Sequence, residues 1–357
     1  MTPLISDAEI ERLVRRDLGD DCLTVAVSGW APVSHAVVNS ATGGLCRVTG
    51  EANGRPWSLI VKTVLAGPTS PDDPAHWNYW RREALAYQSE IPYALAPALT
   101  APRLAGVVPD PENPSRQYLV MEEVTPEAGA AWTRADDALL AERLGQWGAL
   151  PQRAPWLSPA YLRGILRSGA YIMQAVDAAR VWEFPHIARE FPSDLVERIR
   201  ELVRRSEPLH QILEAMPRVL CHCDTHRGNV MLSRGEDGSR QFVLIDWSTV
   251  GLGAPGEELG HQFSSNVLVG QVPPKDAADH AETLISGYCK GMPAASEHQV
   301  RTSFTVTTAL RTFGFALPLI LRAGSDPHNQ SAIAFAPRLG ANIRALLPYL
   351  DAALNLL

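Results

Sequence analysis

The stretch VLCHCDTHRGNVML, at residues 219–232, carries a set of charged, imidazole and amide side chains between two short apolar runs. They are His222, Asp224, His226, Arg227 and Asn229. A turn between two buried strands needs Gly, Asn or Asp for its backbone and no such set of charged groups. This stretch therefore either binds a metal ion directly or acts on a substrate that is brought to it.

The spacing of the carboxylates and the amide indicates which chemistry is meant. His222, Asp224 and Asn229 form the pattern H-x-D-x-x-x-x-N, and Asp246 follows seventeen residues after Asn229, at the end of the apolar run QFVLID. Carboxylate and amide oxygens at strand ends form a set that suits Mg²⁺ rather than Zn²⁺. The pattern therefore predicts a magnesium site.

A lysine and a glutamate upstream complete the set. Of 32 basic residues only three are lysines, and Lys62 is the single lysine of the first 274 residues. It lies inside the apolar run WSLIVKTVL, and Glu83 follows in the helical pattern WRREALAY. Lysine is a compact point charge on a flexible stem, and a lysine held by a glutamate is positioned to contact phosphate oxygens. A base, two metal ligands, a phosphate-binding lysine and its anchor are the components of phosphoryl transfer.

A zinc site at Cys221, His222, Cys223 and His226 is the alternative for the same stretch. Adjacent residues of a strand point to opposite faces, so the first three of these side chains do not easily converge on one ion. The sequence also lacks a second Cys pair with C-x-x-C spacing to complete a tetrahedral site. The phosphoryl-transfer interpretation is therefore favoured.

The elements that must position these residues change character along the chain. Ser6 and Glu9 predict a capped helix over residues 6–18, and strand-like runs then follow up to residue 65, with Asn53-Gly54 as a hairpin turn. Helical patterns lie at 76–91, 133–149, 158–178, 193–205, 208–215 and from 256 onward, and strand-like runs lie at 103–108, 116–124 and within 217–247. This order predicts an α+β fold with a β-rich part, 1–122, a mainly helical part, 123–357, and a cleft between them.

The order Lys, Glu, H-x-D-x-x-x-x-N, Asp resembles that of the protein-kinase-like superfamily. The sequence HCDTHRGNVML, followed by VLIDWSTVGLGAPGEELG, is similar to the motifs of the aminoglycoside phosphotransferase and choline kinase branch. In that branch the first motif is typically H-G-D-x-H-x-x-N and the second is I-D-W/F. The resemblance runs from about residue 40 to about residue 260. It implies a bilobal protein-kinase-like fold with a nucleotide-binding N-terminal lobe and a helical, catalytic C-terminal lobe.

The resemblance also implies roles for individual residues. Asp224 would be the catalytic base, Asn229 and Asp246 would bind Mg²⁺, and Lys62 would contact the phosphates of ATP or GTP while pairing with Glu83. The segment LVMEEV, 119–124, would be the hinge that binds the nucleotide base, through Met121, Glu122 and Val124. NSATGG, 39–44, would cover the phosphates, with Ser40 and Thr42. His222 and Glu258 would have structural roles at the site.

Two positions depart from the pattern of the branch. Position 223 is Cys where the branch often has Gly, so the backbone there is expected to be accommodated differently. Glu258, in EELG, stands where an Asp before Leu is usual, and its expected role is to brace the catalytic loop.

The acceptor is expected to be a small molecule with a hydroxyl group. Only 11 residues separate Asp246 from Glu258, too few for the long activation segment of a protein kinase. The helical region 151–200 has seven arginines against five acidic residues, which favours a neutral or anionic acceptor over a polycation, although aromatic residues keep choline-like acceptors open. An antibiotic, nucleoside, sugar or related metabolite fits this description.

Two other classes of function stay open on the sequence. One is a pseudokinase-like protein that binds a nucleotide without turnover. The other is a metal-dependent hydrolase that uses Asp224, Asn229 and Asp246 but does not need Lys62.

Composition sets the remaining expectations. The net charge of −7 argues against nucleic acid as the main partner, and five cysteines in a chain of this length indicate a reducing compartment. The N-terminal sequence has no apolar signal core, and the apolar run FGFALPLIL, 313–321, is too short to span a bilayer. We predict a cytoplasmic monomer or homodimer that binds neither nucleic acid nor membranes.

Overall fold

The computed structural model describes residues 5–33, 42–67, 72–76, 78–127, 131–151, 154–157, 160–235, 237–323 and 330–357. The chain divides into two compact units. The first comprises Met1–Ala130 and Met231–Ser248, and the second comprises Ala131–Val230 and Thr249–Leu357. The predicted parts, 1–122 and 123–357, differ from these units mainly in the segment Met231–Ser248, which packs with the N-terminal unit although it lies far along the chain.

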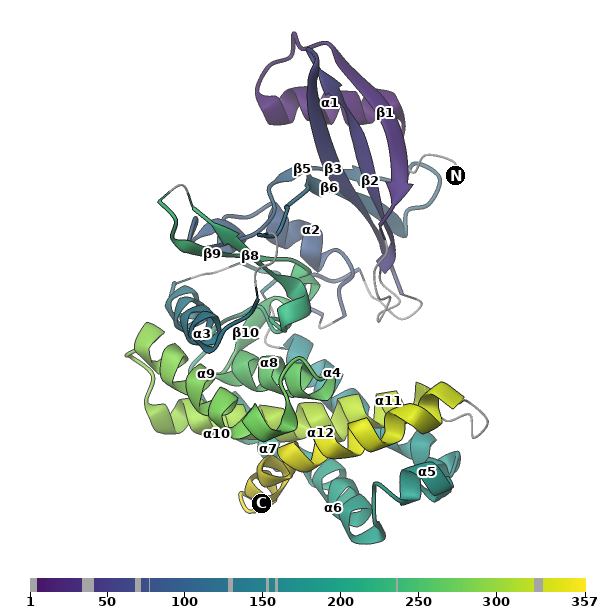
Figure 1. The fold of residues 1–357 in the computed structure, drawn as a ribbon, viewed down its shortest axis with the longest axis vertical. Helices are drawn as coiled ribbons and strands as arrows, with labels where there is room; N and C mark the ends of the chain where they lie inside the picture. The colour runs from purple at the N-terminus through teal and green to yellow at the C-terminus, as the bar shows by residue number, and fades with distance from the viewer. Residues whose placement is uncertain are drawn as a thin grey trace. The chain divides into compact units, whose positions relative to one another are not determined.

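The first unit is built on a five-stranded antiparallel sheet in the order β1-β2-β3-β6-β5 (Figure 1). The strands are β1 (Val25–Pro32), β2 (Thr42–Ala52), β3 (Arg55–Leu65), β5 (Leu104–Pro109) and β6 (Arg116–Glu122). Helix α1 (Asp7–Leu18) packs on the sheet through Ile10, Leu13 and Val14, which are buried with apolar residues of the strands. The predicted β-rich N-terminal region is confirmed.

Local signals placed two features of this unit correctly. Ser6 caps α1 by accepting a hydrogen bond from the backbone N–H of Glu9. Asn53 and Gly54 connect β2 to β3 with φ of 48° and 76°, which are the two left-handed residues that a two-residue type I′ hairpin requires.

The helix expected over 76–91 is much shorter in the structure. Helix α2 spans only Arg82–Tyr87. The hydroxyl of Ser89 donates to the carbonyl of Ala86 and accepts from the N–H of Ile91, so it ends the helix, and the 3₁₀ turn η1 (Ile91–Tyr93) follows. Serine competes in this way with helical backbone hydrogen bonds, a competition that the apolar pattern does not show.

Three short strands form a second sheet in the order β4-β9-β8. Its strands are β4 (Leu99–Thr100), β8 (Val230–Arg234) and β9 (Arg240–Leu244). β4 pairs in parallel with β9 through Leu99 and Phe242. This pairing ties the segment Met231–Ser248 to the N-terminal unit.

The second unit is mainly helical, as predicted. Its α-helices are α3 (Arg134–Gly148), α4 (Ala160–Ala178), α5 (Pro185–Ala188), α6 (Ser193–Arg204), α7 (Ser206–Glu214), α8 (Glu257–Leu268), α9 (Ala277–Gly291), α10 (Glu297–Ala309), α11 (Leu317–Ala323) and α12 (Gln330–Leu354). The shorter elements are the 3₁₀ turns η2 (Val181–Glu183), η3 (Arg227–Asn229), η4 (Trp247–Thr249) and η5 (Pro274–Asp276), the π-helix η6 (Leu310–Ala316), and the strands β7 (Val219–Cys221) and β10 (Gly251–Gly253), which pair with each other. Aromatic rings fill the space between α8, α10 and α12, where Phe263 lies 5.2 Å from both Phe304 and Tyr349.

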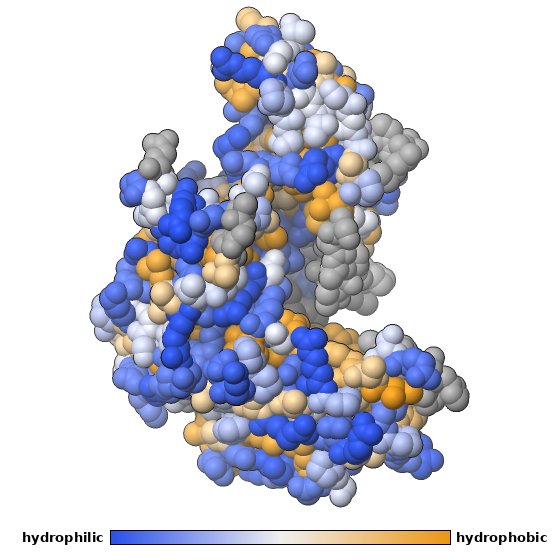
Figure 2. Space-filling model, in the orientation of Figure 1, coloured by the Kyte–Doolittle hydropathy of each residue, from blue (hydrophilic) through white to orange (hydrophobic). Residues whose placement is uncertain are grey.

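The apolar run expected to be too short for a membrane belongs to a longer helical stretch. Residues Glu297–Arg322, from α10 to α11, are long and apolar enough to cross a bilayer, but 67% of their most apolar window is buried inside the protein. Such burial is typical of a core helix. On the face drawn in Figure 2, hydrophilic and apolar residues are interspersed over the surface of this unit.

Helices α3 and α9 approach each other closely at glycines. A Cβ atom on Gly145 would lie 2.5 Å from the carbonyl oxygen of Tyr288 and 3.1 Å from the backbone of Gly291. A Cβ on Gly287 would lie 2.4 Å from the carbonyl oxygen of Ala138. The helix contact therefore exists only because these positions have no side chain.

We expect the change Gly145→Ala to lower the free energy of unfolding by about 1–3 kcal/mol, because backbone must move to admit the methyl group. Gly314→Ala is the matched control, since its Cβ would meet no atom within 4 Å and alanine is favoured over glycine in a helix by roughly 0.5–1 kcal/mol. Denaturant unfolding of both variants measures the difference. Equal stability of the two variants would contradict the close approach.

Candidate active site

Lys62 lies on the central strand β3 of the first unit, opposite Leu45 of β2 and Leu119 of β6. Its ammonium group is 2.8 Å from a carboxylate oxygen of Glu83 on α2, and 3.0 Å from Oδ1 of Asp246, just after β9. The structure therefore brings together three residues that are far apart in the sequence. All three were predicted to belong to the site.

These charges are largely removed from water. The side chains of Lys62, Glu83 and Asp246 are 9%, 2% and 25% exposed, so Asp246 is the member that faces outward. Burial alone would lower the pKa of Lys62, but the carboxylates of Glu83 and Asp246 outweigh it and hold that pKa above its ordinary value. Burial is also the largest influence on Glu83 and raises its pKa to about 7. The lysine is thus kept as a fixed positive charge.

Neighbouring groups hold the two carboxylates in place. Glu83 accepts a hydrogen bond from the backbone N–H of Trp247, and the hydroxyl of Ser248 donates to Oδ1 of Asp246 at 2.8 Å. Asp246 has a left-handed backbone, with φ of 61°. Such a conformation is uncommon outside glycine and is enriched in Asp and Asn.

In the second unit, Asp224 and Asn229 are held together within one loop. The side-chain amide of Asn229 donates to Oδ2 of Asp224 at 2.9 Å and to its carbonyl oxygen at 3.0 Å. Because both amide hydrogens are directed at Asp224, the amide oxygen of Asn229 points elsewhere. This orientation suits an oxygen ligand for Mg²⁺, as the sequence predicted for Asn229.

Glu258 lies beneath this loop and is fully buried. Its Oε2 accepts the backbone N–H of His222 at 3.1 Å, and the carboxylate also accepts the N–H of Cys223. Burial outweighs these hydrogen bonds and raises the pKa of Glu258 to about 8. The glutamate thus contacts the loop in the way that was expected of the usual aspartate.

Cys223 shows how the loop accommodates the loss of glycine. Its φ is 66°, in the left-handed region, where a side chain costs of order 1–3 kcal/mol. The side chain is 2% exposed and packs on Cys221. The hydroxyl of Thr249 also donates to the carbonyl oxygen of His222 at 2.6 Å, so contacts on several sides fix this backbone.

Arg227 anchors the other end of the loop. Its guanidinium group donates to both carboxylate oxygens of Asp137, at 3.3 and 2.6 Å, and to the carbonyl oxygen of Gln271 at 2.7 Å. Its backbone N–H donates to the side-chain oxygen of Asn266 at 3.0 Å. Arg227 therefore positions the loop and is not placed to act on a substrate.

Two histidines lie near Oδ1 of Asp224. Nε2 of His226 and Nδ1 of His261 each lie 3.8 Å from Oδ1 of Asp224. His226 lies in the polar stretch that the sequence analysis singled out, whereas His261 belongs to α8 and was not identified from the sequence. The only sequence signal for His261 is its position three residues after Glu258, on the same helix.

Comparison with known proteins supplies the class of the molecule. A family profile described as "Phosphotransferase enzyme family" matches residues 68–298, more than half of the chain. The chain belongs to this family. The resemblance inferred from the motifs is thereby confirmed, and so is the prediction that the protein is a phosphotransferase.

Solved structures show the same fold as this phosphotransferase. Spectinomycin phosphotransferase APH(9)-Ia, in complex with ADP and spectinomycin, aligns with a TM-score of 0.58 over 97% of this chain and 99% of its own, at 14% identity. Amicoumacin kinase hAmiN, in complex with AMP-PNP, Ca²⁺ and Ami, aligns with a TM-score of 0.56 over 90% of this chain and 88% of its own, at 12% identity. An aminoglycoside phosphotransferase from Alicyclobacillus acidocaldarius aligns with a TM-score of 0.54 over 99% and 97%, at 14% identity. None of the curated proteins matches the sequence at a significant level.

The predicted nucleotide contacts of the phosphotransferase are only partly described. Ser40 lies outside the described residues, and Thr42 begins β2 with its side chain outside them. In the predicted hinge, Met121 is buried, and the backbone N–H of Glu122 donates to the carbonyl oxygen of Arg103 at 2.9 Å. That N–H is therefore used within the protein, and Val124 follows the end of β6.

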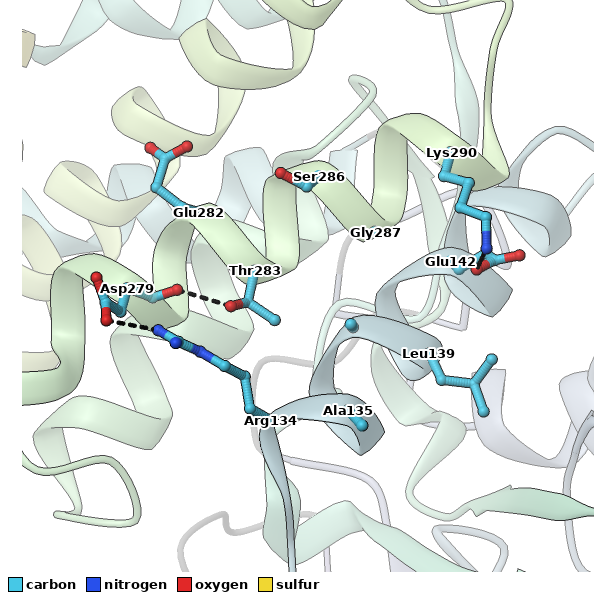
Figure 3. A pocket seen from close by; sticks show the side chains of 11 residues that line it. Arg134, Ala135, Leu139, Glu142, Asp279, Glu282, Thr283, Ser286, Gly287 and Lys290 are labelled. Atoms are coloured by element: carbon cyan, nitrogen blue, oxygen red, sulfur yellow. Dashed lines mark hydrogen bonds and ion pairs between the residues drawn. The ribbon is translucent and has the colours of Figure 1, made fainter.

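A surface groove of about 670 Å³ lies between α3 and α9 and contains none of the predicted residues (Figure 3). Its charged side chains are all paired: Arg134 with Asp279 at 2.7 Å, Lys290 with Glu142 at 2.6 Å, and Glu282 with Arg301, outside the groove, at 2.7 Å. The groove follows from the small residues at this helix contact. Its charges are satisfied, so it is not a candidate active site.

The raised pKa of Glu258 leads to a prediction about stability. A carboxyl group whose pKa is raised on folding stabilises the fold fully below its unfolded pKa, near 4.5, and loses this contribution as pH rises through its folded pKa of about 8. The variant Glu258→Gln cannot ionise. We therefore expect the unfolding temperature of the natural protein, minus that of the variant, to fall as pH is raised from 5 to 8.

Thermal unfolding at several pH values measures this difference. Glu282→Gln is the control, because Glu282 is exposed and paired with Arg301, and its pKa is lowered. A difference between the natural protein and Glu258→Gln that is constant or grows with pH would show that Glu258 ionises normally in the folded state.

Proposed function

We propose that this phosphotransferase is a small-molecule kinase, which transfers the γ-phosphoryl group of ATP or GTP to a hydroxyl group. The observation that carries the proposal is the buried Lys62, whose ammonium group is fixed by Glu83 and Asp246. A permanently charged lysine beside an outward-facing carboxylate suits the phosphates of a nucleotide and a metal ion. Solved relatives that share the fold are described with ADP and with AMP-PNP.

Asp224 is the proposed catalytic base. Asn229 donates a hydrogen bond to its Oδ2, and Oδ1 is the atom that we propose orients the acceptor hydroxyl. In the reaction, a bond forms between the acceptor oxygen and the γ-phosphorus, the bond from that phosphorus to the bridging oxygen breaks, and the hydroxyl proton passes to Asp224. The products are a phosphate monoester and a nucleoside diphosphate.

Asn229 and Asp246 are the proposed ligands of Mg²⁺. Both offer oxygen atoms, which this ion prefers, and the amide of Asn229 is oriented with its hydrogens toward Asp224. When bound, Mg²⁺ would offset negative charge on the transferred phosphoryl group. Hinge contacts to the base by Met121, Glu122 and Val124, and phosphate contacts by Ser40 and Thr42, remain part of the proposal.

The acceptor belongs to the class of antibiotics, nucleosides, sugars and related metabolites. Relatives of the same fold are named as kinases of spectinomycin and amicoumacin, so the proposal includes an antibiotic acceptor and a role in antibiotic resistance. The cytoplasm is the proposed location, where nucleoside triphosphates are available, and the proposed assembly is a monomer or homodimer without nucleic-acid or membrane partners.

The first test is a mass-spectrometric screen for phosphorylated products. Purified protein receives Mg²⁺, ATP or GTP and a panel of acceptor hydroxyl compounds. We expect a product with the natural protein that Asp224→Asn reduces by about 10²–10⁴-fold, the usual contribution of a general base. Asp237→Asn, an exposed carboxylate between β8 and β9, is the matched control and should keep full activity, and chelation of Mg²⁺ should abolish it.

The outcomes separate the classes of function. Mg²⁺-dependent nucleotide binding without any product from a broad panel would support the pseudokinase-like binder. If the protein forms no product and binds no nucleotide, the kinase function is excluded.

The second test uses Lys62, which a metal-dependent hydrolase would not need. We expect Lys62→Met to lower kcat/KM for phosphoryl transfer by roughly 10²-fold or more, because a charge that stabilises the transferred phosphoryl group is lost. Lys290→Met is the control, since Lys290 is paired with Glu142 on the surface. Circular dichroism must first show that Lys62→Met is folded, because it leaves Glu83 buried without its cation. Undiminished turnover by a folded Lys62→Met would favour the hydrolase.

A further inference from the structure

Two imidazole groups lie near the Oδ1 atom of Asp224. Nε2 of His226 and Nδ1 of His261 both lie 3.8 Å from it, which is longer than a direct hydrogen bond. A hydroxyl oxygen placed about 2.8 Å from Oδ1 can also lie within hydrogen-bonding distance of either nitrogen. The two histidines thus mark where a hydroxyl group would contact Asp224.

His261 is the more buried of the two histidines. Its side chain is 7% exposed, against 29% for His226 and 21% for Asp224. Nδ1 of His261 has no hydrogen-bond partner among the described residues. A buried polar nitrogen without a partner is costly, so a ligand atom that satisfies it would bind favourably.

Burial, and then the positive charge of Arg311, hold the pKa of His261 well below its ordinary value. The imidazole therefore stays neutral at neutral pH. His261 therefore lies near two charges, the negative charge of Asp224 and the positive charge of Arg311.

Contacts between helices place Arg311 beside His261. On α8, Gly260 precedes His261 and Ser264 follows it. The hydroxyl of Thr308, on α10, donates to the carbonyl oxygen of Gly260 at 3.5 Å. The hydroxyls of Ser264 and of Thr312, on η6, lie 2.8 Å apart. A Cβ on Gly260 would lie 2.6 Å from the carbonyl oxygen of Phe304. The two helices are therefore in close contact along this line.

Arg311 belongs to the π-helix η6, and its guanidinium carbon lies 4.8 Å from the ring centre of Phe315. Helix α4 crosses the same turn, because a Cβ on Gly169 would lie 2.0 Å from the carbonyl oxygen of Gly314. π-Helical turns such as η6 are rare and often occur at functional sites. The ring of Phe315 and the crossing helix limit the positions that the guanidinium group can take.

We propose that His261 and Arg311 form the acceptor subsite beside Asp224, and that the acceptor is a hydroxyl compound carrying an anionic group, a carboxylate or a phosphate. His261 contacts the hydroxyl group and Arg311 binds the anion. This inference rests on the proposed kinase function and deepens it. The planar guanidinium group can donate to two oxygens of a carboxylate or a phosphate at once, and it repels a polycationic acceptor from the same place.

The test sorts the acceptor panel by charge into hydroxy acids, sugar phosphates, neutral sugars and nucleosides, and polyamines with hydroxyl groups. We expect Asp224-dependent product from an anionic acceptor. For that acceptor, Arg311→Met should raise KM by roughly tenfold to hundredfold, the usual loss for a hydrogen-bonded charge pair, with kcat little changed. Arg204→Met is the control, because Arg204 is a surface residue paired with Glu197.

A second variant separates binding of the hydroxyl from folding. His261→Phe keeps the size and burial of the ring, and we expect it to lower kcat at least tenfold while KM for the nucleotide stays unchanged. The panel contains hydroxy acids and sugar phosphates as separate classes, so the class that gives the Arg311-dependent product identifies the anion as a carboxylate or a phosphate.

Several results would overturn the inference. They are product from cationic acceptors alone, an unchanged KM in Arg311→Met, and unchanged kcat in a folded His261→Phe. In each case Asp224-dependent transfer would persist, so the proposed kinase function would stand. Binding of nucleotide without product from any anionic acceptor would also count against the subsite, whereas loss of nucleotide binding would refute the kinase function and the subsite with it.

Discussion

The buried positive charge of Lys62 is the constraint on which the first unit depends. Removing an ammonium group from water costs several kcal/mol unless opposite charges compensate for it. Glu83 and Asp246 provide this compensation at 2.8 and 3.0 Å. Strand β3, helix α2 and the end of β9 must therefore converge, which explains why Met231–Ser248 packs with the N-terminal unit.

The loop of the second unit is fixed mainly through its backbone. Glu258 accepts N–H groups of His222 and Cys223, and Thr249 donates to the carbonyl oxygen of His222. These contacts hold Cys223 in a left-handed conformation that favours glycine. A rigid backbone leaves the side chain of Asp224 to be oriented by Asn229, so positioning and chemistry are assigned to different residues.

The charges around Asp224 bear on which acceptors the protein can use. Arg227 is neutralised by Asp137, whereas Arg311 lies over an aromatic ring near His261. A binding site for a polycation would instead need several carboxylates near the base. The family therefore sets the reaction type, whereas the class of acceptor belongs to the proposal made for His261 and Arg311.

The sequence by itself determined the reaction class and the residues of the motifs. Lys62, Glu83, Asp224, Asn229 and Asp246 could be predicted as site residues because the protein-kinase-like superfamily has these residue types in this order. The hairpin at Asn53-Gly54 was recognisable because its backbone conformation is a local property. The tertiary structure alone decided that Met231–Ser248 joins the first unit and that His261 lies near Asp224. These features depend on contacts between segments far apart in the chain, and local sequence patterns carry no information about such contacts.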